Sequence, residues 1–112
     1  MTEKKILLFG LCICAKDGLI SSTEEKALLS LFNEFVKNKG VPFKKVSNSS
    51  FEEVVNEFFS TTYQLEDYVK DIKNSEYLEE ILEIAKNAAS SDGFDILENI
   101  AYKKTLALIN KD

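Results

Sequence analysis

Apolar residues recur every three or four positions along almost the whole chain, the spacing that places them on one face of an α-helix. Such runs occupy residues 2–16, 23–39, 51–59, 65–72, 76–89 and 96–110. Residues 2–16 are apolar nearly all round, so we expect them to form the central, most buried helix. The only stretches that could pass for strands, residues 4–14 and 102–109, are longer than an average strand. The pattern therefore predicts an all-α fold, a compact helical bundle of about six helices.

Residues of the kind that start and stop helices support these limits. Gly40, with Pro42 just beyond it, is a normal stop for the helix of residues 23–39. Ser50 followed by Glu53 forms a capping-box pattern, so we expect the third helix to begin there. The polar residues between these two points predict the one extended loop of the chain.

The chain has 112 residues and 45% hydrophobic residues, which suits a single domain, residues 1–112, with a real core. It carries 19 acidic residues against 14 lysines, a net charge of −5, and has no Arg, His or Trp. Without His there is no His-containing catalytic triad and no ordinary zinc site. Without Arg there is no bidentate phosphate fork, and an acidic chain is a poor nucleic-acid binder. Composition therefore predicts a small non-enzymatic binding module.

The two cysteines, Cys12 and Cys14, lie in an apolar run and are too close in sequence for a structural disulfide. They favour a reducing, cytoplasmic setting. Lys4 and Lys5 before an apolar stretch resemble a short signal peptide, but Glu3 and the lack of a small-x-small cleavage site favour a buried first helix. No stretch reaches 18 apolar residues, so we expect no membrane span.

Two segments, residues 15–24 and 90–98, match each other. Each follows an apolar helix, turns at an Asp-Gly pair, and opens a new helix with an acidic residue in its first turn. The pairs are Asp17-Gly18 and Asp92-Gly93. The repeat predicts two helical hairpins, each with an Asp-Gly turn, related by a pseudo-two-fold axis. Two copies are too few for a solenoid.

Helix capping explains much of the first segment. Gly18 can adopt the left-handed conformation that ends a helix. Ser21 with Glu24, or Ser22 with Glu25, forms a capping box.

Capping explains the second segment in the same way, because Gly93 can end a helix and Asp95 can cap the next one, with Glu98 in its first turn. It accounts less well for Asp17 and Asp92, because an acidic residue just before a helix-ending Gly opposes the helix dipole. Because capping does not account for Asp17 and Asp92, a second interpretation stays open, a cation or polar-ligand site at the two turns.

Together, the duplicated segments within an all-helical chain resemble the tellurite-resistance TerB-like family. The likeness rests on residues 15–21 with Glu24, and on residues 91–93 with Glu98. It implies a compact helical domain with a stress-related or scaffold role. Members of that family occur beside tellurite-resistance genes and phage- or chemical-stress genes, and a similar domain precedes a membrane-anchored DnaJ-type co-chaperone.

The resemblance also implies a divalent cation held by acidic residues at the two turns. Carried onto this chain, the ligands are Asp17 and Glu24 from the first segment, and Asp92 and Glu98 from the second. An all-oxygen site suits Ca²⁺, Mg²⁺ or Mn²⁺. Glu98 lies one position closer to its Asp than Glu24 does, and this departure from the pattern weakens the second half of the site.

Two other functions stay open. In the first, a purely structural interaction domain docks a basic protein partner on acidic helix faces without any metal. The faces are Glu52, Glu53 and Glu57, and Glu66, Asp67 and Asp71. We expect ordinary solvation of such faces, with pairs such as Glu66–Lys70 supporting the helix. The sequence does not identify the partner, and a membrane protein or a second copy of the chain would also serve.

In the second, a carboxylate-only hydrolase uses Asp17 and Asp92. No Ser, Cys or Lys in the chain has a recognisable activating neighbour, so an enzyme is the least favoured of these functions.

Overall fold

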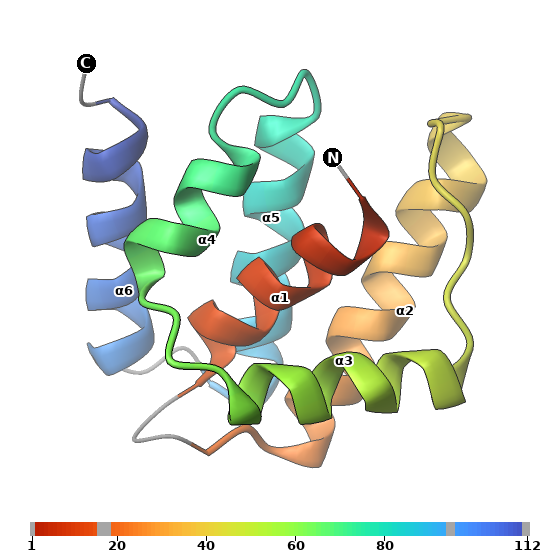
Figure 1. Cartoon of the computed structure of the whole chain (residues 1–112), viewed down its shortest axis with the longest axis horizontal. Coiled ribbons are helices and arrows are strands. Elements are labelled where there is room, and N and C mark those ends of the chain that lie inside the picture. Colours follow the sequence, from red (N-terminus) through yellow and green to blue (C-terminus); the bar gives the residue numbers. More distant parts are fainter. Residues whose placement is uncertain (1, 16–18, 94–95, 111–112) are drawn as a thin grey trace.

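The first helix runs through the middle of the molecule and the other helices surround it (Figure 1). The computed structural model describes residues 2–15, 19–93 and 96–110. The elements are α1 (Glu3–Cys14), α2 (Ser22–Lys39), α3 (Asn48–Ser60), α4 (Leu65–Ile72), α5 (Leu78–Ala89), the short 3₁₀ turn η1 (Ser90–Asp92) and α6 (Ile96–Ile109). The described residues thus form six α-helices and no strand, in a globule of 31 × 29 × 25 Å. The prediction of a compact all-α fold is confirmed.

Helix α1 supplies the centre of the core, as its all-round apolar sequence predicts. Its buried residues are Ile6, Leu7, Leu8, Phe9, Gly10, Leu11, Ile13 and Cys14. It contacts α2, α3, α4, α5 and α6, so a helix with no polar face is covered on every side. Within the part of the chain that is described, none of the helices has the length and apolar character needed to cross a bilayer.

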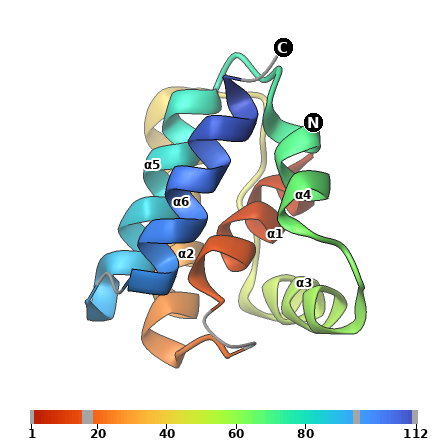
Figure 2. The same ribbon diagram turned by 90° about the vertical axis from the view of Figure 1, so that its left-hand side faces the viewer.

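Helices α5 and α4 lie on opposite sides of α1, and α6 lies between them in the view of Figure 2 and packs against α4. Lys104 on α6 lies 3.4 Å from Glu66 on α4. The ammonium of Lys86 on α5 lies over the ring of Tyr102 on α6. The ion pair of Glu66 with Lys104 joins two helices, and the supporting pair Glu66–Lys70 that the sequence predicted within α4 stays a prediction.

The helix ends confirm one predicted boundary and correct another. Gly40 ends α2 in the left-handed conformation, with φ of 62°, as predicted. Helix α3 begins at Asn48, two residues before the predicted Ser50. Ser47 is the actual N-cap, and its hydroxyl accepts a hydrogen bond from the backbone N–H of Ser50. The prediction was wrong because each of the polar residues 47–50 makes an acceptable cap. Two hydrogen bonds from Asn33 hold Val46 in place, and the helix then starts directly after Ser47.

The two cysteines lie on α1 and are not joined by a disulfide. Cys14 is fully buried and Cys12 partly so. Burial, with a smaller effect from the nearby Glu66 carboxylate, raises the pKa of Cys12 to about 11. At neutral pH this thiol is protonated and behaves as a small apolar side chain.

Candidate functional site

The structure joins the two matching segments by a hydrogen bond between distant residues. The Ser21 hydroxyl donates to Asp92 Oδ2 at 2.8 Å. Ser21 is the N-cap of α2, and Asp92 ends η1. The second Asp-Gly turn therefore lies against the start of α2. Asp17, the corresponding residue of the first turn, is outside the described residues.

Glu24 has a structural task in this junction. Its Oε1 accepts a hydrogen bond from the Ser21 backbone N–H at 3.0 Å, and its own N–H donates to Ser21 Oγ at 3.1 Å. This is the capping box that the sequence predicts. The side chain is only 1% exposed, which is rare for a carboxylate.

Glu98 occupies the matching place in the second segment, in the first turn of α6, and is also 1% exposed. The described residues contain no group of three or more acidic or sulfur side chains arranged to hold a metal ion. Asp17 falls outside the described residues, so the four-carboxylate site of Asp17, Glu24, Asp92 and Glu98 stays a prediction. The predicted helix cap Asp95 also lies outside them.

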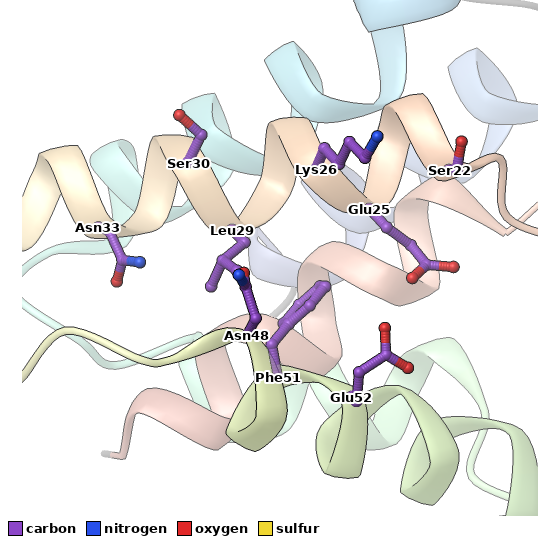
Figure 3. Close-up of a pocket in the computed structure, with 9 residues that line it drawn as sticks. All are labelled: Ser22, Glu25, Lys26, Leu29, Ser30, Asn33, Asn48, Phe51 and Glu52. Carbon is purple, nitrogen blue, oxygen red and sulfur yellow. The ribbon is translucent and has the colours of Figure 1, made fainter.

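A surface groove of about 620 Å³ lies between α2 and α3 (Figure 3). Both helices pack on α1, and α3 runs across the first half of α2 rather than alongside it (Figure 1). The lining residues of the groove are Ser22, Glu25, Lys26, Leu29, Ser30 and Asn33 from α2, and Asn48, Phe51 and Glu52 from α3.

Two carboxylates face each other at one end of this groove. Glu25 of α2 and Glu52 of α3 point toward one another, while the ammonium of Lys26 points away from them (Figure 3). Burial, and then the charge of Glu52, raises the pKa of Glu25 above its ordinary value. Among the described residues, neither carboxylate at this end of the groove has a basic partner within ion-pair distance.

The middle of the groove is apolar and the far end is polar. Leu29 and the buried Phe51 point into the middle from opposite helices (Figure 3). At the far end, the Asn33 side chain donates to the carbonyl oxygen of Val46 at 3.0 Å and accepts from its N–H at 2.9 Å. These two bonds fix the segment that leads into α3 and so fix the groove's width. The Asn48 side chain lies nearer the middle of the groove, next to Leu29 (Figure 3).

The acidic faces predicted as docking surfaces are partly occupied by the protein's own groups. Glu57 pairs with Lys4 at 3.2 Å, and Asp71 lies 3.6 Å from Lys5. Asp67 accepts a hydrogen bond from the Gln64 N–H at 2.7 Å. Glu52 is the member of these faces that lines the groove.

Sequence reasoning missed Glu25 as a site residue because it was interpreted only as the partner of Ser22 in a capping box. The structure uses Ser21 and Glu24 instead, which leaves Glu25 turned toward α3. The spacing of Ser22, Glu25, Leu29 and Asn33 does place them on one helix face. That spacing could have indicated a mixed polar and apolar surface, although it could not have indicated which helix lies opposite.

Comparisons with protein-family models, with curated proteins and with solved structures give no match. The resemblance to the TerB-like family therefore stays a prediction, and the site has to be judged on its own geometry.

Proposed function

We propose that this protein is a non-enzymatic binding module that docks a basic segment of a protein partner in the groove between α2 and α3. The observation that supports this most strongly is the pair Glu25 and Glu52, which face each other from two helices and form no ion pair with any described lysine. A lysine or arginine side chain placed there would relieve their repulsion and form charge-assisted hydrogen bonds to both.

The surroundings of the pair fit the same ligand. The apolar floor formed by Leu29 and Phe51 suits the aliphatic stem of a long basic side chain. The net charge of −5 attracts basic partners over longer distances and speeds their association. Both features belong to one function class that the sequence left open, a metal-free interaction domain for a basic partner.

The test is fluorescence polarisation with a fluorescein-labelled lysine-containing peptide, at low and at physiological salt. We expect weak binding, with a Kd on the order of 0.1–1 mM, and a loss of about tenfold on Glu25→Gln or Glu52→Gln. Glu76→Gln is the matched control, because Glu76 lies in the turn before α5, is exposed, and loses the same charge. Equal effects of all three variants would mean that the attraction is general and would contradict a groove site.

A second candidate is the divalent-cation module that the TerB-like resemblance implies. It is favoured by the hydrogen bond from Ser21 to Asp92, which brings residues of the two segments together. In this arrangement the two hairpins with Asp-Gly turns are related by a pseudo-two-fold axis, and Asp17, Glu24, Asp92 and Glu98 surround Ca²⁺, Mg²⁺ or Mn²⁺. Such a module would act as a stress-associated scaffold in the cytoplasm, with a membrane protein or a second copy as further partners.

Isothermal titration with each of the three ions tests this second candidate. Binding that disappears on Asp92→Asn, together with a higher melting temperature in the presence of the ion, would support it. No heat at millimolar ion and an unchanged melting temperature would exclude it.

A further inference from the structure

The sequence of acidic, apolar and polar side chains along the groove between α2 and α3 constrains the shape of its ligand, in addition to the ligand's charge. Along α2, Glu25 stands at one end, Leu29 in the middle and Asn33 at the far end. On α3, Glu52 faces Glu25 and Phe51 faces Leu29, while the Asn48 amide lies next to Leu29 (Figure 3). The acidic zone and the apolar zone thus each receive a side chain of the same character from both helices. A ligand that matches the groove needs a cationic group and an apolar group at a fixed separation.

Helix geometry gives that separation. Glu25 and Leu29 are four residues apart on α2, which is about 6 Å along the helix axis at 1.5 Å per residue. In an extended peptide successive side chains point to opposite faces, and residues two positions apart lie on one face at about 6.6 Å. The two spacings agree closely. If the two residues of the peptide were adjacent, or three positions apart, their side chains would lie on opposite faces of the extended chain. One of the two would then point away from the groove.

A polar side chain beside the apolar zone suits an extended backbone. The unpaired N–H and C=O groups of an extended peptide need partners when they enter a groove. The Asn48 side chain, which offers both donors and an acceptor, lies next to Leu29 (Figure 3). Asn33 is already committed to Val46 and acts as a rigid wall rather than as a ligand. The whole distance from Glu25 to Asn33, eight residues of helix or about 12 Å, corresponds to about four residues of extended chain.

We propose that the groove recognises an extended segment of a partner protein in which a lysine or arginine lies two positions from an aliphatic residue. The cationic group sits between Glu25 and Glu52, and the aliphatic side chain packs between Leu29 and Phe51. This inference rests on the proposed docking function and specifies the partner motif that the same site accepts.

The experiment compares capped seven-residue peptides of identical composition by isothermal titration against the full chain. The first has the order glycine–serine–lysine–serine–leucine–serine–glycine, with lysine and leucine two positions apart. The second places lysine and leucine next to each other, and the third separates them by three positions. We expect the first peptide to bind about tenfold more tightly than the other two. Glu25→Gln should weaken the first peptide about tenfold, and replacing its leucine with serine should abolish its advantage.

The possible outcomes distinguish failure of the spacing rule from failure of the docking function. If all three peptides bind equally and all respond to Glu25→Gln, the docking function survives and the spacing rule is overturned. If no peptide binds, or if Glu25→Gln and the control Glu76→Gln act alike, both the spacing rule and the docking function are overturned. A fourth peptide with glutamate in place of lysine should not bind, and its binding would also overturn both.

Discussion

At the scale of single residues, the hydroxyl of Tyr68 is poorly matched to its surroundings. The side chain is 2% exposed, and no hydrogen-bond partner for the hydroxyl lies among the described residues. Burial raises the pKa of Tyr68 to about 12, with smaller effects from Cys12 and Tyr63. The ring packs against Phe58 and Tyr63, so the aromatic part is well placed even though the polar part is not.

Tyr68→Phe removes this buried hydroxyl and keeps the ring. Because an unsatisfied buried polar group costs free energy, we expect the unfolding free energy to stay constant or to rise by up to about 1 kcal/mol. Urea denaturation followed by circular dichroism measures this, with the exposed Tyr63→Phe as a control that should change little. A loss of more than about 1 kcal/mol for Tyr68→Phe would show that the hydroxyl makes a stabilising bond.

Glu3 gives a pH dependence with a defined sign. Its Oε2 accepts a hydrogen bond from the Lys44 N–H at 2.9 Å, and this bond is the largest cause of a pKa lowered from the ordinary 4.5. A carboxyl with a lowered pKa in the folded state stabilises the protein above its unfolded pKa, and this stability is lost as the pH falls through the folded pKa.

We therefore expect Glu3→Gln to lower the unfolding free energy by about 0.5 kcal/mol at pH 7, a small value because the group is near solvent. The difference from the unmodified protein should be smaller at pH 3 than at pH 7, because the carboxyl becomes protonated as the pH falls through its lowered folded pKa. Urea titrations at the two pH values decide the point. A difference that is the same at both values would mean that charge on Glu3 contributes nothing.

The residue scale also shows how far local sequence rules reach. The capping box of Ser21 and Glu24 and the stop at Gly40 are short-range features, and both are confirmed. The prediction of Ser50 as the N-cap of α3 was wrong. Asn33, which is distant in sequence, holds Val46 by two hydrogen bonds, and this places the cap at Ser47.

At the scale of elements, the packing of α1 on α2 depends on Gly10. A Cβ at this position would lie 2.5 Å from Cδ1 of Leu28, closer than real Cβ contacts allow. Leu28 is fully buried, so its side chain has little room to move aside. The absence of a side chain at Gly10 therefore allows the two helices to approach closely.

Gly10→Ala should destabilise the protein, although alanine favours the helix intrinsically. The overpacking cost of about 1–3 kcal/mol exceeds the gain of about 1 kcal/mol from helix propensity. In a Leu28→Val background, which makes room for the new methyl group, the same substitution should cost less or become stabilising. Thermal melts of the four proteins test this. Equal costs in both backgrounds would exclude a clash with Leu28 as the cause.

Helices α2 to α5 were predictable because each buries one apolar face in the core around α1 and so repeats its apolar residues with the period of a helix. Helix α6 departs from this, because Glu98 and Thr105 are its buried residues while Ile96, Leu97 and Ile100 are exposed. Helix α1 was predictable as the central one for the complementary reason that it has no polar face to expose. The groove was not predictable, because it depends on where α2 and α3 lie on α1, and no local pattern carries that information.

At the scale of the whole molecule, the hydrogen bond from Ser21 to Asp92 joins two residues that lie 71 positions apart in the sequence. It connects the start of α2 with the turn that leads from α5 toward α6. The sequence repeat pointed to these two segments, and the structure shows that they meet through this bond. Because Asp17 lies outside the described residues, the predicted arrangement of carboxylates around a cation stays a prediction.

A double-mutant cycle of Ser21→Ala and Asp92→Ala measures the energy of this link. We expect Ser21→Ala to cost about 1–2 kcal/mol, because it removes the N-cap as well as the bond. The coupling energy between the two substitutions should be about 0.5–1.5 kcal/mol. Strictly additive effects in urea denaturation would mean that the two residues do not stabilise the protein together.

The proposed docking of a basic segment between α2 and α3 can be located on the molecule by nuclear magnetic resonance. The measurement is a titration of the isotope-labelled protein with the lysine–serine–leucine peptide, followed through the backbone amide signals. We predict that the shifted signals gather at residues 22–33 and 48–52, and that the double variant Glu25→Gln, Glu52→Gln abolishes them. Shifts centred on the turn at residues 90–93, or no shifts at millimolar peptide, would contradict a binding site in this groove.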